Sequence, residues 1–316
     1  PSSRLHHMVA VLNHKKFSWH NQPLDLEFGA AWGRDDGQRE GLHQMLGQLS
    51  WLSEQAGSER RVLALDEEQE LVVDQTTEQV RLLMRVKQVL KERALMLYAQ
   101  PIHNREGEGY HEILTRMRCG DSVIMPDQFI PLIVQFNLSQ RFDMLVLETL
   151  FSVLHQHPGQ RFSVNLLPAT LMQKDSAVQI IALFQRYAVS PDLITIEVTE
   201  EQAFSNADIS QQNLEALRAF GCAIAIDDFG TGYANYERLK HLQADIIKID
   251  GCFVRDILTD PLDAIMVKSI VEMARAKQMS VVAEYVESEP QKARLLELGV
   301  NYLQGYLVGK PQPLGE

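Results

Sequence analysis

Residues 223–233 read Ala-Ile-Ala-Ile-Asp-Asp-Phe-Gly-Thr-Gly-Tyr and carry the strongest fold signal in the chain. The first four residues are apolar and partly β-branched, which predicts a buried strand. This strand runs into two adjacent acids, Asp227 and Asp228, and a turn with two glycines follows. Carboxylates at the end of a buried strand are costly to desolvate unless a cation or hydrogen-bond donors meet them. An isolated Asp-Asp pair is more often a helix cap beside a solvated acid, so the other strands decide between the two interpretations.

Eight strand patterns, most of them separated by helical patterns, fill the chain from Leu95 onward. The predicted strands are residues 95–102, 111–117, 162–167, 193–199, 222–229, 246–250, 280–286 and 302–308. The predicted helices are residues 126–156, 177–187, 206–220, 263–278 and 290–298. This alternation predicts an α/β fold, a TIM-like (β/α)8 barrel, with an open doubly wound sheet as the alternative.

Polar side chains interrupt the apolar pattern of the predicted strands, most of them at the strand ends, which is where such a barrel carries its chemistry. They are Glu112, Asn165, Glu197, Glu200, Asp227, Asp228, Lys248, Asp250, Glu284, Glu287 and Gln304. So many acids around one rim would repel one another and raise one another's pKa values. Hard divalent cations relieve that repulsion, and oxygen ligands select Mg²⁺, Mn²⁺ or Ca²⁺. The pattern therefore predicts a metal site.

Composition excludes several classes of protein. The net charge of −12 argues against a general affinity for nucleic-acid polymers, although a small phosphorylated ligand is compatible with it if metal ions offset the charge. Three cysteines without a Cys-x-x-Cys pattern argue against a disulfide framework and indicate a reducing compartment. No apolar run is long enough to span a membrane and no signal peptide is visible. We expect a cytoplasmic-side fragment of a longer protein, and membrane contact only through an upstream region absent from this chain.

Residues 1–66 have the patterns of a small α+β unit. They show a short helix over 5–12, two strands within 17–32, a helix around 42–52 and a strand over 61–65. This order resembles the C-terminal half of a GGDEF (diguanylate cyclase) domain, but the Gly-Gly-Asp/Glu-Glu-Phe signature is absent, so we expect no cyclase activity. Residues 67–93 are predicted to be a linker and a connector helix, in which residues 66–73 form the acidic linker and residues 77–93 the helix. Residues 94–316 form the second domain.

Several motifs of the second domain resemble those of an EAL domain, the family of cyclic di-GMP phosphodiesterases. They are Gln100-Pro101-Ile102, Glu112-Ile113-Leu114, Val164-Asn165-Leu166, Glu197-Val198-Thr199-Glu200, Asp227 to Tyr233, Lys248-Ile249-Asp250, Ala283-Glu284 and Gln304-Gly305-Tyr306. The resemblance implies hydrolysis of cyclic di-GMP to linear 5′-phosphoguanylyl-guanosine with two divalent cations, Mg²⁺ or Mn²⁺, and Ca²⁺ as a candidate inhibitor. It also implies a homodimer formed through this domain.

The same resemblance assigns roles to individual residues. The implied metal ligands are Glu112, Asn165, Glu197, Asp227, Asp228 and Glu284. The implied catalytic residues are Glu284 as general base and Lys248, which would orient the attacking water. The implied substrate contacts are Gln100, Arg116, Asp250 and Gln304, and Glu200 would brace the loop after Asp228.

Some positions depart from the family pattern, and Tyr285 is the one with a physical consequence. The family's glycine after the catalytic glutamate is Tyr285 in this chain. If that position requires positive φ, the tyrosine strains the backbone beside Glu284. Milder departures are Ile113, Leu166, Met117 and Gln135. Tyr285 therefore keeps open an alternative, a receptor that binds cyclic di-GMP without cutting it and signals to a protein partner.

Overall fold

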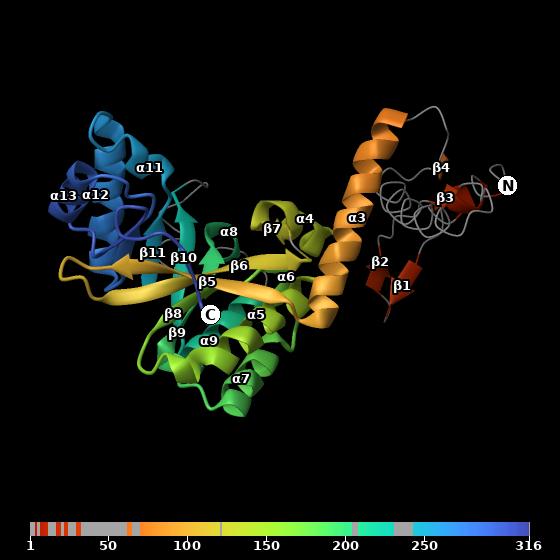
Figure 1. Cartoon of the computed structure of the whole chain (residues 1–316), viewed down its shortest axis with the longest axis horizontal. Coiled ribbons are helices and arrows are strands. Elements are labelled where there is room, and N and C mark those ends of the chain that lie inside the picture. Colours follow the sequence, from red (N-terminus) through yellow and green to blue (C-terminus); the bar gives the residue numbers. More distant parts are fainter. Residues whose placement is uncertain are drawn as a thin grey trace. The chain divides into compact units, whose positions relative to one another are not determined.

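The computed structural model describes residues 4, 7–11, 17–19, 22–24, 30–32, 62–64, 70–120, 122–203, 208–230 and 243–315. Contacts divide the chain into two compact units, Pro1–Gln88 and Val89–Glu316 (Figure 1). None of the described helices combines the length and the apolar composition that crossing a membrane requires.

The first unit contains four short strands among its described residues. β1 (Phe17–Trp19) pairs antiparallel with β2 (Gln22–Leu24), and β3 (Ala30–Trp32) pairs in parallel with β4 (Val62–Ala64). The strand expected over residues 61–65 is therefore confirmed, while residues 17–32 hold three strands instead of two. Residues 7–11 are helical as expected. The helix expected around residues 42–52 lies outside the described residues, and the resemblance to a GGDEF domain stays a prediction.

The connector helix α3 (Glu70–Glu92) is longer than the sequence patterns suggested. It begins within the acidic stretch 66–73, which was predicted to be a linker. The physical reason is that no glycine or proline interrupts the chain between Glu70 and Glu92, so nothing stops helix formation before residue 77. The helix is followed by Arg93, whose φ of 59° turns the chain into the first barrel strand.

Eight strands of the second unit close into a barrel, as the alternating patterns predicted. Around the ring the order is β5, β13, β12, β11, β10, β9, β8 and β6, and the pairing of β5 with β6 closes it. The strands are β5 (Leu95–His103), β6 (Gly109–Cys119), β8 (Phe162–Asn165), β9 (Ile194–Thr199), β10 (Ala223–Phe229), β11 (Ile246–Ile249), β12 (Ser280–Ala283) and β13 (Tyr302–Gln304). Two short strands extend the sheet, β7 (Ser122–Ile124) on β6 and β14 (Gln312–Pro313) on β5.

The strand β5 runs antiparallel to both of its neighbours, which the sequence patterns did not predict. The cause is the five-residue connection from β5 to β6, which suits a hairpin and is too short for a parallel crossover. The Asn104 side chain stabilises this turn by accepting hydrogen bonds from the backbone N–H groups of Glu106 and Glu108, at 2.9 Å each. The remaining ring strands are parallel, so their carboxyl ends meet at one rim.

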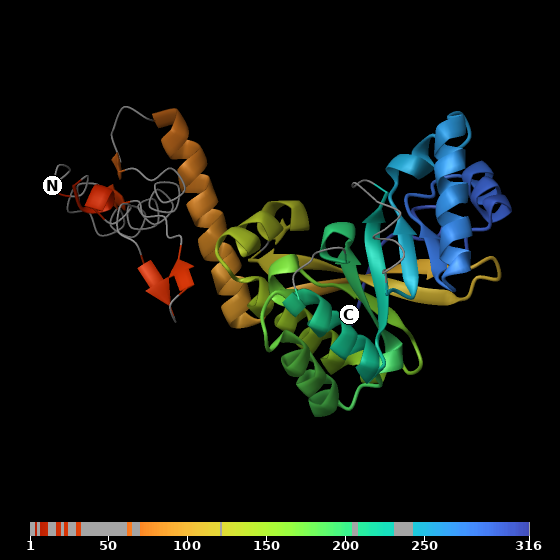
Figure 2. The same ribbon diagram turned by 180° about the vertical axis from the view of Figure 1, so that it is seen from behind.

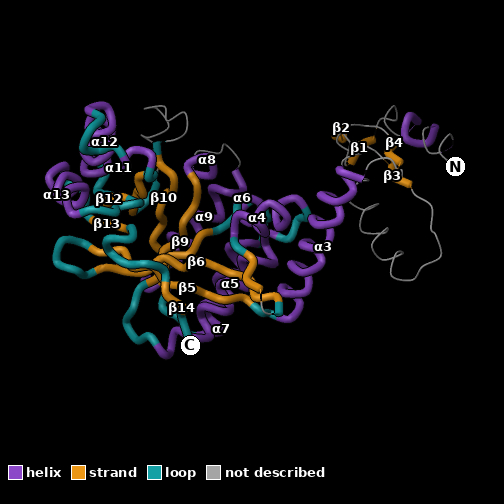
Figure 3. Tube along the Cα trace, turned by 45° about the horizontal axis from the view of Figure 1, so that its top comes forward, coloured by secondary structure: helices purple, strands orange, loops and turns teal. Residues whose placement is uncertain are grey.

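Helices cover the outside of the barrel (Figures 1 and 2). They are α4 (Pro126–Gln135), α5 (Ser139–Val153), α6 (Pro168–Leu171), α7 (Ser176–Tyr187), α8 (Glu200–Ala203), α9 (Asp208–Phe220), α11 (Cys252–Arg255), α12 (Pro261–Ala276) and α13 (Glu289–Leu298), with 3-10 turns at Leu154–Gln156 and Pro191–Leu193. The single helical pattern predicted over residues 126–156 is divided between α4 and α5, because Asn137 adopts a left-handed φ of 52°. In the tube view the helices lie beside and behind the sheet, while β5, β6 and β14 face the viewer without a helix in front of them (Figure 3).

Two apolar clusters position the site. The larger one joins the outer faces of β10 to β13 to α11, α12 and α13, and Ile247, Val267 and Leu295 are fully buried in it. The smaller one comprises Ile102, Tyr110 and Val282, with Tyr302 packed against it. The Tyr110 and Tyr302 rings meet edge to face with centroids 5.9 Å apart. The strands that carry the polar rim residues are thus held by packing on both sides.

Candidate active site

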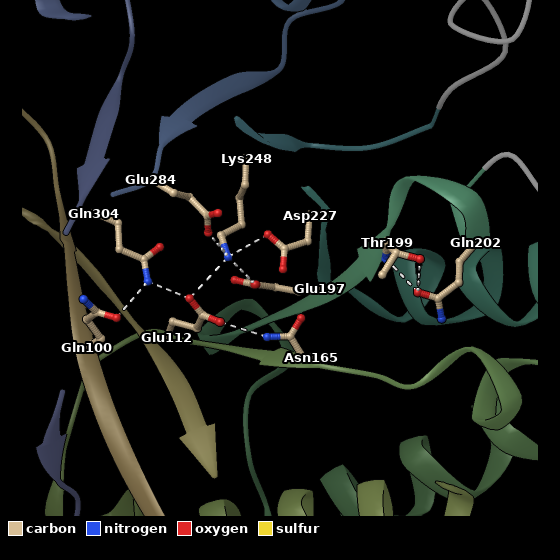
Figure 4. A network of polar contacts seen from close by, with 10 residues as sticks. All are labelled: Gln100, Glu112, Asn165, Glu197, Thr199, Gln202, Asp227, Lys248, Glu284 and Gln304. Carbon is tan, nitrogen blue, oxygen red and sulfur yellow. Dashed lines mark hydrogen bonds and ion pairs between the residues drawn. The ribbon is translucent and has the colours of Figure 1, made fainter. Parts of the chain in front are cut away.

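Every strand of the barrel contributes one side chain to a polar network (Figure 4). In ring order they are Gln100 from β5, Gln304 from β13, Glu284 directly after β12, Lys248 from β11, Asp227 from β10, Glu197 from β9, Asn165 from β8 and Glu112 from β6. The sequence predicted each of these residues, and the structure brings them together.

Lys248 occupies the centre of this network and is completely buried. Its Nζ lies 2.7 Å from Glu197 Oε2, 2.8 Å from Glu284 Oε1, 2.9 Å from Asp227 Oδ1 and 3.2 Å from Glu112 Oε2. An ammonium group has three N–H donors and so cannot satisfy four carboxylates. Glu197 Oε1 is buried without a hydrogen-bond partner. The network therefore holds more acceptor oxygen than its own donors can use.

Burial and mutual repulsion set the protonation of this cluster. Burial raises the pKa of Glu197, and the charge of Lys248 opposes that effect only in part; the same two influences leave the pKa of Glu284 raised. Burial alone would lower the pKa of Lys248, but the surrounding carboxylates, Asp227 foremost, raise it well above its ordinary value. Lys248 is therefore a permanent ammonium that cannot accept a proton, while Glu197 and Glu284 bind a proton more readily than ordinary carboxyl groups do.

Glu112 links the ammonium to three amide side chains. Asn165 Nδ2 donates to Glu112 Oε1 at 2.8 Å, and Gln304 Nε2 donates to Glu112 Oε2 at 2.6 Å. Gln304 Nε2 also lies 3.3 Å from Gln100 Oε1, and Gln100 Nε2 donates to the Gly309 carbonyl at 3.1 Å. Because Nδ2 of Asn165 is used by Glu112, its carbonyl oxygen is the atom it can offer to a cation.

Among the described residues, one group of side chains could hold a metal ion between carboxylate oxygens that lie within 4.8 Å of one another. It consists of Asp227, Asp228 and Glu284. Hard divalent cations take oxygen ligands of this type. The crowded carboxylates and the unpartnered Glu197 oxygen fit the cations that the sequence patterns predicted. Asp228 reaches this group through a left-handed backbone, with φ of 54°.

Glu200 contacts the backbone two residues after Asp228. Its Oε2 accepts a hydrogen bond of 2.9 Å from the backbone N–H of Gly230, and its loop-bracing role stays a prediction. Burial raises the pKa of Asp228, and the charges of Asp227 and Asp250 add to that effect. The later residues of this motif, Thr231, Gly232 and Tyr233, lie outside the described residues.

Tyr285 adopts the positive φ that was anticipated for the family's glycine, at 55°. The ring occupies space over Gly251, where a Cβ would lie 2.3 Å from a ring carbon. The Arg255 guanidinium stacks on the ring, 5.2 Å from its centroid. These contacts hold a half-exposed tyrosine in a backbone conformation that costs roughly 1–2 kcal/mol for a non-glycine residue.

Asp250 and Arg116 lie outside the acid network. Asp250 Oδ1 accepts a hydrogen bond of 2.8 Å from the backbone N–H of Cys252. Although burial would raise its pKa, hydrogen bonds from Cys252 and Gly251 hold the pKa of Asp250 low. Arg116 donates to the Thr115 carbonyl at 2.7 Å and stacks on the Tyr98 ring, 5.4 Å from its centroid. Their roles toward a substrate stay predictions.

Two buried side chains next to this site were missed by the sequence patterns. Asp143 accepts hydrogen bonds from the Leu167 N–H and the Thr170 hydroxyl, and burial raises its pKa to about 7. Gln202 contacts Thr199 and Leu166. A signal for Gln202 was present, because Thr199-x-x-Gln202 matches a helix capping box. Nothing in the local sequence marks Asp143, which lies in the middle of a helix.

Comparison with known proteins identifies the class of this barrel. The EAL domain family matches residues 44–311, so the chain belongs to the EAL domain family. The match begins well before residue 94, where the second domain was predicted to start.

Individual relatives carry informative names. The chain is 58% identical to "Probable cyclic di-GMP phosphodiesterase PdeA" of Escherichia coli strain K12, over 99% of this chain and 44% of that protein. It is 38% identical to "Cyclic di-GMP phosphodiesterase PdeF" of the same organism, over 95% of this chain and 41% of that protein. The chain thus spans less than half the length of either relative. The solved structure "PaMucR Phosphodiesterase, c-di-GMP complex" superposes with a TM-score of 0.68 at 34% identity, covering 74% of this chain and 98% of that one.

Proposed function

We propose that the barrel hydrolyses cyclic di-GMP to linear 5′-phosphoguanylyl-guanosine with the help of divalent cations. The observation that carries this proposal is the buried network of Glu112, Glu197, Asp227 and Glu284 around one ammonium. It stands on a barrel of the EAL family, whose relatives are named for this activity. A cluster so rich in acceptor oxygen suits cations and the phosphodiester that they bind.

The residues divide into cation ligands and groups that act on the substrate. Glu112, Asn165, Glu197 and Asp227 would hold one cation, and Asp227, Asp228 and Glu284 would hold a second, either Mg²⁺ or Mn²⁺. When bound, these cations supply charge neutralisation and activation of the attacking water. The raised pKa values of Glu197 and Glu284 imply that binding releases protons.

The chain's own groups manage the proton and the substrate. Glu284 takes a proton from the water whose oxygen forms the new bond to phosphorus, and the bond from phosphorus to the 3′ oxygen breaks as that oxygen takes a proton from solvent. Lys248 stays protonated throughout, so it orients the water and offsets the growing negative charge on phosphorus. Gln100, Arg116, Asp250 and Gln304 contact the dinucleotide, and a guanidinium such as that of Arg116 suits a phosphate oxygen.

The test is incubation of the purified protein with cyclic di-GMP and Mg²⁺ or Mn²⁺, followed by chromatographic separation of the products. We expect the linear dinucleotide to form, and a chelator to stop its formation. Binding of intact cyclic di-GMP with no product in the presence of either cation would overturn the proposal in favour of a receptor.

We propose further that the barrel forms a homodimer. α12 and the turn before it expose a run of large apolar side chains: Leu258 by 52%, Leu262 by 68%, Ile265 by 58% and Met266 by 41%. Leu262, Ile265 and Met266 stand at helical i, i+3 and i+4 positions of α12, and exposed apolar side chains on one face of a helix favour a protein interface. Sedimentation over a range of protein concentrations should show a dimer that Ile265→Glu weakens; a monomer at every concentration would refute it.

The domain organisation also extends beyond the barrel. We propose a partial GGDEF-like unit in residues 1–66, a connector in residues 67–93 and the EAL barrel in residues 94–316. An upstream membrane anchor is part of this proposal. Limited proteolysis that cuts within residues 67–93 would support the division, and cuts only inside the barrel would contradict it.

A further inference from the structure

The short helix α8 contacts the residues that directly follow β8 and β10, two strands that carry candidate cation ligands. It follows β9 directly, and its residue Gln202 is buried. Gln202 Oε1 accepts hydrogen bonds from the backbone N–H of Thr199 at 2.6 Å and from the Thr199 hydroxyl at 3.0 Å (Figure 4). Gln202 Nε2 donates to the carbonyl oxygen of Leu166 at 3.3 Å. One side chain therefore joins the end of β9 to the loop after β8.

The chemistry of the partners fixes which way the Gln202 amide points. The Thr199 N–H group can only donate, so the oxygen of the amide has to face it. The amide nitrogen then faces the Leu166 carbonyl, which can only accept. A carboxylate in the same place would keep the bonds to Thr199 but would set an oxygen against the carbonyl of Leu166. The amide is thus specifically required for the link to the β8 loop.

The hydrogen bond from Gln202 is made to Leu166, the residue next to the candidate ligand Asn165. Leu166 directly follows Asn165, whose side chain donates to Glu112. The backbone N–H of Leu166 donates to the Glu197 carbonyl at 3.0 Å, so Leu166 is tied to β9 and α8 through both its N–H and its C=O groups. These two hydrogen bonds fix the position of Asn165 relative to Glu197 along the strand direction. They therefore fix the distance between the Asn165 amide oxygen and the Glu197 carboxylate, which are offered to one cation.

We propose that Gln202 is a positioning residue that holds Asn165 in register with Glu112 and Glu197 for cation binding. This inference rests on the proposed function, because it takes those three residues to share a cation. Glu200, on the same helix, accepts a hydrogen bond from Gly230, directly after β10. α8 thus holds the residue that follows each of two ligand-bearing strands, Gly230 through Glu200 and Leu166 through Gln202.

If Gln202 only caps α8, its substitutions should have different effects. Capping of α8 needs only Oε1, as in a capping box, whereas positioning of Asn165 needs Nε2. Gln202→Glu keeps the cap and removes the link. Gln202→Met removes both without adding a charge, and it carries the test if the buried carboxylate prevents folding. Gln160→Glu, the same exchange at an exposed residue of the turn before β8, is the matched control.

The experiment measures Mn²⁺ binding to each purified variant by calorimetry, in the absence of nucleotide, together with the melting temperature in chelator. Loss of a side chain that orients a metal ligand weakens metal binding by roughly 10–100-fold. We therefore expect the dissociation constant for Mn²⁺ to rise by about tenfold or more in both Gln202 variants. In Gln160→Glu it should equal that of the wild type. The Mn²⁺ concentration for half-maximal hydrolysis should rise by the same factor, with the rate recovering at saturating Mn²⁺.

The outcomes separate this inference from the proposed function. Unchanged Mn²⁺ affinity in a folded Gln202 variant, with a lowered melting temperature alone, would show that the residue only caps α8 and would overturn the inference. If the wild-type protein binds Mn²⁺ but forms no linear dinucleotide, the proposed function fails, while weaker Mn²⁺ binding in the variants would still support the positioning role.

Discussion

Replacement of Lys248 by methionine should make the barrel depend on added cations for its stability. Methionine keeps the length of the side chain but removes the charge that faces four carboxylates within 3.2 Å. Removing one partner of a buried ion pair costs about 3–5 kcal/mol, because the remaining charges stay buried and unpaired. The variant should lose about that much stability in a chelator.

The size of the effect can be converted to a melting temperature. For a unit of the size of Val89–Glu316, each kcal/mol shifts the melting temperature by about 2–4 °C. The expected loss is therefore about 6–20 °C in chelator. Lys268→Met, an exposed lysine on α12 whose ion pair with Glu272 is 4.0 Å long, makes the same exchange at the surface and should melt within about 2 °C of wild type, since exposed pairs contribute little.

Added Mn²⁺ should reverse most of this loss. In the wild-type protein a cation competes with the Lys248 ammonium for the same oxygens, whereas in the variant it has no competitor. A cation at a hundred times its dissociation constant stabilises the folded state by about 2.7 kcal/mol, and tighter binding in the variant enlarges that gain. Hydrolysis of cyclic di-GMP should nevertheless be lost, because no ammonium remains to orient the water.

The assay is thermal unfolding of Lys248→Met, Lys268→Met and wild type in chelator and in a Mn²⁺ series, with hydrolysis measured in parallel. The reasoning is refuted if Lys248→Met melts within about 2 °C of wild type in chelator. It is also refuted if Mn²⁺ raises the melting temperatures of both proteins equally, since Lys248 would then not be the group that neutralises the cluster.

Substitutions at four further residues test other parts of the structure. Glu112→Ala and Glu284→Ala should each abolish hydrolysis and leave the circular dichroism spectrum unchanged; residual turnover comparable to wild type would remove both residues from the mechanism. Tyr285→Gly should be more stable than Tyr285→Ala by about 1 kcal/mol in urea unfolding, because alanine keeps the cost of the left-handed backbone and loses the ring contacts; equal stabilities would contradict this. The folded-state pKa of Asp143 is raised to about 7 from 3.8. Its contribution to the free energy of unfolding is therefore complete below pH 4, and about 4 kcal/mol of it is lost as the pH rises to 7. Asp143→Asn should lack this part of the pH dependence, and an unchanged profile would show that Asp143 does not cause it.

The barrel and its rim were predictable because each strand carried its own signal. Most of the parallel ring strands are short apolar runs with a polar residue at or near the end, as Ile246–Ile249 is beside Lys248 and Asp250. In a parallel barrel such ends must converge, so Glu197, Asp227 and Glu284 could be grouped before any distance was known. The positive φ of Tyr285 could also be anticipated, because this residue stands where the family has a glycine, the residue that most readily adopts positive φ.

Other features depend on contacts that no local pattern encodes. The burial of Lys248 among four acids follows from the barrel's radius and register, and the orientation of Arg116 toward Tyr98 follows from packing. The reversed direction of β5 is a different case. Only eight residues separate the predicted strands 95–102 and 111–117, too few for a crossover helix, so this signal was present and pointed to a hairpin.

The backbone at two positions beside the candidate ligands is held by contacts within the protein. Asp228 and Tyr285 both hold left-handed conformations, which persist in non-glycine residues only where the surroundings enforce them. Glu200 enforces the first through Gly230, and Gly251 with Arg255 enforces the second. Neither restraint involves Lys248. Because Asp228 and Tyr285 do not rely on the ammonium for their backbone conformation, a cation can replace its charge among the carboxylates without moving these two residues, which is the condition for a preorganised site.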